Sequence, residues 1–213
     1  MKQTFLTCRS AEVCCGETPV LLRGFGLGGW LLPEGYMWQM EGTIDRPRRM
    51  EQLIESLCGE EYASSFWKRY EGCYITRTDI EWIASLGFNS VRLPINARRL
   101  FRFIDNKAEF QTETLQHVDD LIDWCREFGI YVVLDMHAAP GGQTGQNIDD
   151  SETDQPELFR TAIYQDQLCS AWTLLAARYA HEPVVAAYDL LNEPLPDFFR
   201  QYNDGVLPLY RWF

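Results

Sequence analysis

The sequence has few basic residues: 19 lysines and arginines stand against 31 aspartates and glutamates, a net charge of −12 at pH 7. Such a chain repels polyanions and offers no basic face for phosphate groups, so we expect neither a nucleic acid nor an anionic membrane as its partner. The sequence also has no apolar run as long as a membrane span, and its first ten residues contain no apolar signal core. We therefore expect a cytoplasmic protein, unless a leader has been removed.

The sequence contains no C-x-x-C pair, although it has seven cysteines, of which only Cys14 and Cys15 are adjacent. This spacing matches neither a zinc site nor a disulfide framework. We expect free thiols in a reducing compartment and no bound metal.

The chain is rich enough in apolar residues, at 46% of 213, to bury one substantial core. Without a repeat or linker, residues 1–213 read as one unit, with a short hairpin first and a helical insertion at about 40–75. Buried strands that alternate with helices are typical of a parallel α/β sheet covered on both faces. Two architectures stay open at this point, a doubly wound sheet and part of a (β/α)8 barrel. The pattern predicts strands over 18–24, 90–94, 130–136 and 184–191, and helices over 47–57, 60–71, 76–86, 112–128 and 156–179.

The glycines of residues 23–30, Arg-Gly-Phe-Gly-Leu-Gly-Gly-Trp, match the dinucleotide-binding pattern G-x-G-x-x-G. A pyrophosphate would need a helix directly after the glycines, but Pro33 and Gly35 forbid one. We therefore expect no cofactor, which argues against a nucleotide-dependent oxidoreductase. The glycines more simply let the first strand turn tightly and bring Trp30 over a pocket.

Polar side chains stand at or just beyond the carboxyl end of every predicted strand. In a barrel these ends meet at one edge, where catalytic sites are built. A carboxyl crowded there has a raised proton affinity, which suits general acid catalysis. The residues are Glu34 after the first strand, Arg92 and Asn96 at the second, His137 after the third, and Asn192 and Glu193 after the fourth.

Several of these residues have a simpler structural interpretation that the sequence leaves open. Arg92 lies between apolar residues and must meet an anion or a carbonyl, in a site or in a purely structural ion pair. His137 is either a pocket residue or a core histidine bonded to a backbone carbonyl. The aromatic Trp30, Tyr36 and Trp38 either stack on sugar rings or pack in the core. We interpret the run Arg46-Pro-Arg-Arg as a solvated charge cluster at a helix start.

Four motifs together resemble glycoside hydrolase family 5, the cellulase family, and are most similar to its exo-β-1,3-glucanase-like and related bacterial β-glucanase members. They are Leu-Arg-Gly-Phe-Gly-Leu-Gly-Gly-Trp-Leu at 22–31, Leu-Gly-Phe-Asn-Ser-Val-Arg-Leu-Pro at 86–94, Leu-Asp-Met-His-Ala-Ala-Pro-Gly-Gly-Gln at 134–143, and Tyr-Asp-Leu-Leu-Asn-Glu-Pro at 188–194. The sequence departs from many relatives at Gly26, where they carry asparagine.

The resemblance implies a (β/α)8 barrel that hydrolyses O-glycosidic bonds of β-glucans with retention. It assigns the acid/base to Glu193 and a bond with the sugar 2-hydroxyl to Asn192. It makes Arg92 the support of the nucleophile and His137 a sugar-binding residue. Glu34 matches a carboxylate that contacts the terminal sugar in exo-acting members, and Trp30 precedes it at the pocket.

The resemblance also puts the nucleophile, a glutamate, at the end of the seventh strand, whereas this sequence predicts only strands one to four. We therefore expect the N-terminal half of a barrel, about four βα units, with its last residues in the helix after strand four. Asp135 and Asp189 are expected to be structural. The open sheet edges could lead to self-association, and a non-catalytic carbohydrate-binding or assembly half-barrel is the alternative function.

Overall fold

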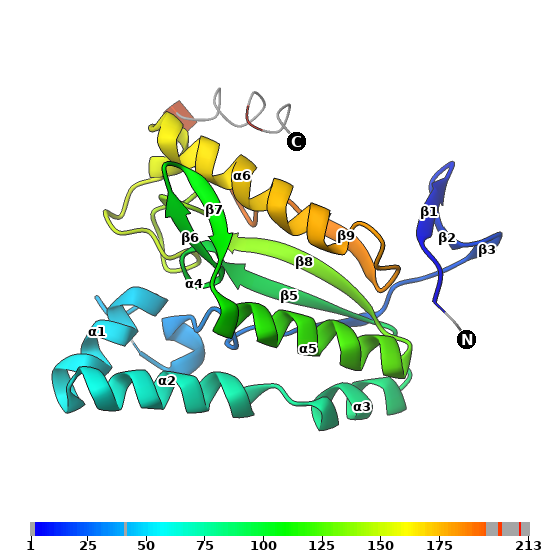
Figure 1. Cartoon of the computed structure of the whole chain (residues 1–213), viewed down its shortest axis with the longest axis horizontal. Helices are drawn as coiled ribbons and strands as arrows, with labels where there is room; N and C mark the ends of the chain where they lie inside the picture. The colour runs from blue at the N-terminus through cyan, green and yellow to red at the C-terminus, as the bar shows by residue number, and fades with distance from the viewer. Residues whose placement is uncertain (1–2, 41, 195–199, 202–208, 210–213) are drawn as a thin grey trace.

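The centre of the protein is a four-stranded parallel sheet (Figure 1). The computed structural model describes residues 3–40, 42–194, 200, 201 and 209. Neighbouring strands in the sheet also follow one another along the chain, which confirms the predicted order. The strands are β4 (Gly24–Gly26), β5 (Ser90–Asn96), β8 (Tyr131–Ala138) and β9 (Val185–Asp189).

The alternation of side chains along β5 and β8 separates a core face from a polar face. Leu93 pairs in register with Leu134, and both belong to the hydrophobic core. Successive residues of a strand point to opposite faces, so Arg92 and Asp135 lie on the other side of the sheet. In the described part of the chain, the hydrophobic core therefore lies on one face of the sheet, and the polar side chains lie on the other.

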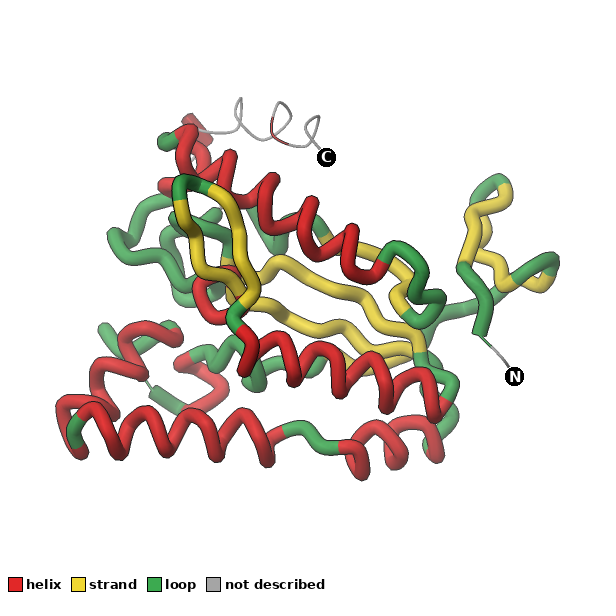
Figure 2. The backbone as a smooth tube through the Cα atoms, viewed as in Figure 1, coloured by secondary structure: helices red, strands yellow, loops and turns green. Residues whose placement is uncertain are grey.

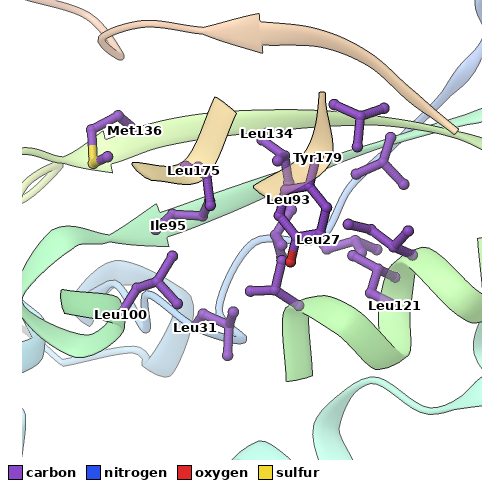
Figure 3. Packing of buried hydrophobic residues seen from close by; sticks show 14 of the residues in the cluster. Leu27, Leu31, Leu93, Ile95, Leu100, Leu121, Leu134, Met136, Leu175 and Tyr179 are labelled. Atoms are coloured by element: carbon purple, nitrogen blue, oxygen red, sulfur yellow. The ribbon is translucent and has the colours of Figure 1, made fainter. Parts of the chain in front are cut away.

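Three helices supply the other half of this core: α3 (Arg77–Ser85), α5 (Thr112–Phe128) and α6 (Ala162–Tyr179). Leu121 and Leu175 reach the sheet from α5 and α6 (Figure 3). The predicted capping box is present, because Thr76 and Asp79 exchange bonds at the start of α3. These helices hold the sheet from one side and leave its carboxyl edge to the loops.

The first predicted strand, 18–24, is wrong. Residues Thr18–Pro19 form β3 of a separate antiparallel sheet with β1 (Leu6–Arg9) and β2 (Glu12–Cys15), which stands apart from the parallel sheet (Figure 2). Only the glycine segment itself, β4, joins the parallel sheet. The apolar run misled the prediction because Leu21 is largely exposed and is not part of the core.

The region between β4 and α3 is helical, with a 3₁₀-helix η1 (Gly35–Trp38), α1 (Pro47–Cys58) and α2 (Glu60–Tyr74). The predicted helix over 156–179 begins later, at Ala162, after a separate 3₁₀-turn η2 (Glu157–Phe159). The sequence did not predict the short α4 (Ala97–Leu100) or the hairpin of β6 (Phe101–Ile104) and β7 (Lys107–Phe110).

All seven cysteines are free. No helix in the described part of the chain is long and apolar enough to cross a membrane. Nor do the described histidines, cysteines and carboxylates form a group that could hold a metal ion. The prediction that the last residues continue as a helix concerns residues that lie mostly outside the described ones.

Candidate functional site

The polar face of the sheet carries a connected group of side chains that we call the strand-end cluster: Glu34, Arg92, Asp135, His137 and Asn192. Arg92 comes from β5, while Asp135 and His137 lie two residues apart on β8 and so share a face. Asn192 follows β9 and is held there by a bond from its backbone N–H to the carbonyl of Met136. Three neighbouring strands thus deliver their polar groups to one edge.

Arg92 meets anions, as its position in a buried strand required. Its guanidinium lies 3.0 Å from Asp135 Oδ2 and 2.8 Å from Asp189 Oδ2. The same group donates a 2.8 Å hydrogen bond to Asn192 Oδ1. Arg92 therefore ties the strand carboxylates Asp135 and Asp189 to the loop that precedes Glu193.

His137 is bonded to side chains and is not the core histidine of the alternative interpretation. Its Nδ1 lies 2.6 Å from Asp135 Oδ2, and its Nε2 lies 3.3 Å from Asn192 Nδ2. Because a carboxylate only accepts, we assign the proton to Nδ1, which leaves Nε2 to accept from Asn192. Burial raises the pKa of Asp135, whereas His137 and Arg92 oppose that rise.

Glu34 approaches this group from the segment after β4, with Oε1 3.9 Å from His137 Nε2. Its side chain is buried, and burial is the largest cause that raises the pKa of Glu34. The carboxylates of Glu193 and Asp135 raise that pKa further, while His137 and Arg92 lower it. Glu34 is thus a carboxyl that holds its proton more tightly than an exposed glutamate does.

Glu193 lies beside this cluster, with its side chain exposed and not enclosed by the crowded strand end that the sequence suggested. The negative charge of Glu193 still acts on its neighbours, because it contributes to the raised pKa of both Glu34 and Tyr36. Its backbone has φ +38°, a left-handed conformation that is uncommon for a residue with a side chain. The carboxylate is accessible to a ligand from solvent.

Gln143 is a site residue that the sequence analysis missed. Its buried side chain accepts from Ala139 N and donates to the carbonyls of His137 and Asn192, at 3.1, 2.7 and 3.0 Å. It therefore joins the end of β8 to the peptide that leads into Glu193. The motif at 134–143 contains Gln143, but no local pattern shows that its partner lies 49 residues away.

The prediction that Trp30 lies over a pocket is wrong, because the structure buries this side chain in the core. Its side chain is 0% exposed, and its Nε1 donates a 2.7 Å bond to the carbonyl of Glu71. A sugar ring cannot stack on a side chain without accessible surface, so Trp30 serves the core. The exposed aromatic residue near the cluster is Tyr36, while Trp38 packs against Trp67 and Tyr70.

The glycines before Trp30 form the tight turn that the sequence analysis expected, although the turn leads Trp30 into the core and not over a pocket. They form β4 and a turn, and no helix intervenes before η1 at Gly35. A Cβ at Gly24 would lie 1.7 Å from the carbonyl oxygen of Ser90, so glycine is needed for close strand pairing. The helix N-terminus that a dinucleotide pyrophosphate requires does not follow the glycines.

A second network, which we call the loop anchor, fixes the loop after β8 to α1. The interpretation of Arg46-Pro-Arg-Arg as a solvated cluster is wrong for Arg46, which is 2% exposed. Its guanidinium bonds Asp45 and the loop residues Ser151 and Asp154. The members of the loop anchor are Asp45, Arg46, Arg48, Arg98, Asp149, Asp150, Ser151 and Asp154.

Comparison with known proteins identifies the family of this chain. The family described as Cellulase (glycosyl hydrolase family 5) matches residues 56–206. A beta-xylosidase of Phanerodontia chrysosporium is 34% identical over 175 residues, which cover 82% of this chain and 36% of that protein. The probable glucan 1,3-beta-glucosidase A of Aspergillus fumigatus is 30% identical over 200 residues, 87% of this chain and 47% of that protein.

A solved structure extends the comparison to the fold. The rutinosidase from Aspergillus niger superposes with a TM-score of 0.68 at 18% identity, over 89% of this chain and 56% of that one. The chain spans less than half the length of the two curated relatives above. Its parallel sheet corresponds to part of the barrel of these glycosidases. The chain belongs to the cellulase family, glycosyl hydrolase family 5.

Proposed function

We propose that this chain supplies the acid/base and the sugar-binding residues of a retaining β-glucan hydrolase. The observation that carries the proposal is the strand-end cluster, in which Arg92 and His137 both bond Asn192, the neighbour of the exposed Glu193. A side chain that contacts a sugar must be held in position and must also be accessible from solvent. The strand-end cluster holds Asn192 in position, and the side chain of the adjacent Glu193 is exposed.

In the proposed mechanism, Glu193 protonates the leaving oxygen of the glycosidic bond and later takes a proton from the attacking water. Asn192 presents its amide to the sugar 2-hydroxyl while Arg92 holds the amide oxygen. His137 and Glu34 bind further hydroxyls. The carboxyl oxygens of Glu34 can accept a hydrogen bond from a sugar hydroxyl.

Retention requires a second carboxylate about 5 Å from the acid/base, which attacks the anomeric carbon. Asp135 and Asp189 are both engaged by Arg92, and Glu34 is buried with its Oε1 3.9 Å from His137 Nε2. We therefore assign the nucleophile to none of these residues. The family resemblance puts it on a seventh barrel strand, which lies beyond the four strands of this sheet.

The relatives favour a β-glucan as substrate, since they include a probable glucan 1,3-beta-glucosidase and an endoglucanase C of Acetivibrio thermocellus. Tyr36, which is 57% exposed beside Glu34 and Glu193, offers a ring for the apolar face of a sugar. The second candidate is a carbohydrate-binding half-barrel without catalysis. The observation in its favour is that Arg92 pairs with both strand carboxylates, Asp135 and Asp189.

The test is to assay the purified chain on an aryl β-glucoside and on laminari-oligosaccharides. It is assayed alone and with the C-terminal half of the A. fumigatus relative supplied as a separate polypeptide. We expect sugar binding by the chain alone, and turnover only when the second polypeptide completes the site. General acid catalysis alone supplies only about 10² to 10⁴ of the needed acceleration.

Glu193→Gln should abolish that turnover, whereas Glu61→Gln, an exposed glutamate on α2, should leave it unchanged. Turnover by the chain alone that Glu193→Gln removes would show that a nucleophile lies within these residues. Sugar binding without turnover in any combination would favour the non-catalytic candidate. If no sugar binds at all, both are wrong.

A further inference from the structure

A cavity of about 370 Å³ opens at the carboxyl edge of the sheet, beside the strand-end cluster but separate from it. Its lining includes Asn96 at the end of β5 and Ala139, Pro140 and Gly141 just after β8. Phe101 and Phe103 of β6 and Tyr164 and Gln167 near the start of α6 line its other sides. No residue of the strand-end cluster lines it, and Glu193 does not either.

Aromatic rings form one part of its wall. Phe103 and Tyr164 are half-buried, so each keeps part of its ring accessible, and Phe101 lies buried behind them against Phe110. The Tyr164 ring rests directly on Gly141, where a Cβ would lie 2.4 Å from it. This contact fixes the ring in place. The cavity therefore has a preformed apolar surface.

The charged residues around the cavity neutralise one another. Asp150 is buried and accepts from Arg98 Nε at 2.8 Å and from Asn96 Nδ2 at 3.0 Å. Arg48 lies 3.3 Å from Glu152 and also donates to the carbonyl of Asp150. Because both arginines are already paired, the cavity offers no free cation to an anionic ligand.

The lining also contains two neutral polar groups whose hydrogen-bonding atoms are available to a ligand. The Tyr164 hydroxyl and the Gln167 carboxamide form no side-chain hydrogen bond with any residue that the structure describes. The Tyr164 hydroxyl can both donate and accept a hydrogen bond, and the Gln167 carboxamide carries two donors and an acceptor oxygen. Neutral hydrogen-bonding groups beside accessible rings match a sugar, which has hydroxyls at its rim and apolar C–H faces.

We propose that this cavity binds a glucosyl residue at a second sugar site, with Tyr164 and Gln167 as its recognition residues. The volume falls in the range of about 300 to 1,000 Å³ that is usual for small-molecule sites. The choice of β-glucan as the source of that residue rests on the proposed function. The sugar stacks on the Tyr164 and Phe103 rings and bonds the Tyr164 hydroxyl and the Gln167 carboxamide.

Titration of the isotope-labelled chain with laminaritriose, followed by amide resonances, tests the two sites separately. Binding in the cavity shifts the backbone amide of Gly141 and the side-chain amide of Gln167. Binding at the strand-end cluster shifts the amides of Asn192 and Glu193. We expect both groups of resonances to move.

The variants Tyr164→Phe and Gln167→Ala, combined, should weaken the titration at Gly141 at least about tenfold, since each loses a hydrogen bond to the sugar. The shifts at Asn192 and Glu193 should keep their midpoint. Tyr164→Phe retains the ring on Gly141, and thermal unfolding of each variant verifies the fold. Gln116→Ala, an exposed glutamine on α5, is the matched control and should change neither midpoint.

The outcomes separate this inference from the proposed function. If only Asn192 and Glu193 respond, the second site is wrong and the proposed function stands. If only Gly141 and Gln167 respond, the cavity binds sugar and the role given to the strand-end cluster fails. An unchanged Gly141 midpoint in the double variant overturns the assignment of Tyr164 and Gln167, and no response at any residue overturns both proposals.

Discussion

The strand-end cluster and the loop anchor are both networks of arginines and carboxylates at the same edge of the sheet, yet they differ in how fully their groups are bonded. In the loop anchor, both oxygens of Asp149 and both of Asp150 accept hydrogen bonds. In the strand-end cluster, Asp135 Oδ1 is buried and has no partner among the described residues. Glu34 Oε1 lies 3.9 Å from His137 Nε2, beyond hydrogen-bond distance.

This difference separates a network that stabilises the fold from one that is prepared for a ligand. A buried polar group without a partner costs free energy, so a network selected for stability satisfies each of its members. The strand-end cluster keeps an unsatisfied oxygen and two carboxyls whose pKa is raised. Groups of this kind gather at functional sites. Four substitutions test whether the two networks differ in this way.

The largest effect is expected at the loop anchor. Arg46→Ala removes a buried guanidinium together with its bonds to Ser151 and to the Asp45 carboxylate. The free energy of unfolding should fall by about 3 kcal/mol, as for other broken buried ion pairs. Urea denaturation measures it. Arg77→Ala, in an exposed pair with Glu127, is the control and should cost much less, because solvent screens an exposed ion pair.

Equal losses for the two arginines would mean that the loop anchor is not a stabilising network.

The sequence did not predict the loop anchor, for a physical reason. A run of three nearby arginines looks the same whether it faces water or a carboxylate, and Arg46 meets Ser151 across 105 residues. Helix spacing, caps and strand runs are local signals, which is why α5, β8 and the capping box of α3 were predicted.

A smaller loss is expected for Gln143→Ala. The substitution leaves the N–H of Ala139 and the carbonyls of His137 and Asn192 buried without their bonds. We expect a loss of about 2 kcal/mol in the free energy of unfolding. It should be accompanied by weaker sugar binding, because the Asn192 peptide loses its support. Gln165→Ala, which removes one bond to Leu158, should cost about 1 kcal/mol and leave sugar binding unchanged.

A Gln143 variant that keeps full sugar affinity would contradict the role of Gln143 in supporting Asn192.

The strand-end cluster was largely predictable, since parallel strands bring their carboxyl ends together and so gather Glu34, Arg92, His137 and Asn192. Trp30 was placed wrongly because the sequence shows that an aromatic residue follows a turn but not which way the ring points. That direction depends on α2, which supplies the carbonyl of Glu71.

The pH dependence of stability should distinguish the networks by a still smaller effect. Glu34 has a raised pKa in the folded protein, so the fold binds its proton more tightly than the unfolded chain does. The resulting stabilisation is complete below the ordinary glutamate pKa and is lost as the pH rises through the raised value. Glu34→Gln should therefore reduce the fall in stability between about pH 4 and pH 7.

Urea denaturation across that pH range measures the difference between the wild type and Glu34→Gln. Asp135 has the same sign of shift and remains in the variant, so part of the slope should persist. Glu61→Gln, an exposed glutamate on α2, serves as the control and should keep the full slope. A slope that Glu34→Gln leaves intact would mean that Glu34 is as easily ionised as a surface glutamate.

The smallest effect is expected at Glu193, and its sign is the informative part. The residue has φ +38°, where asparagine is tolerated better than glutamate, and its charge faces Glu34. Glu193→Asn should therefore raise the free energy of unfolding by about 0.5 kcal/mol, because it removes both costs. Glu193→Gln removes the charge but keeps the backbone conformation, so the difference between the two variants isolates the backbone strain. If asparagine gives no more stability than glutamine, no strain is stored at Glu193, and its unusual backbone is neutral. A gain in stability together with loss of turnover in the completed enzyme would instead mark Glu193 as a residue held in its position for function.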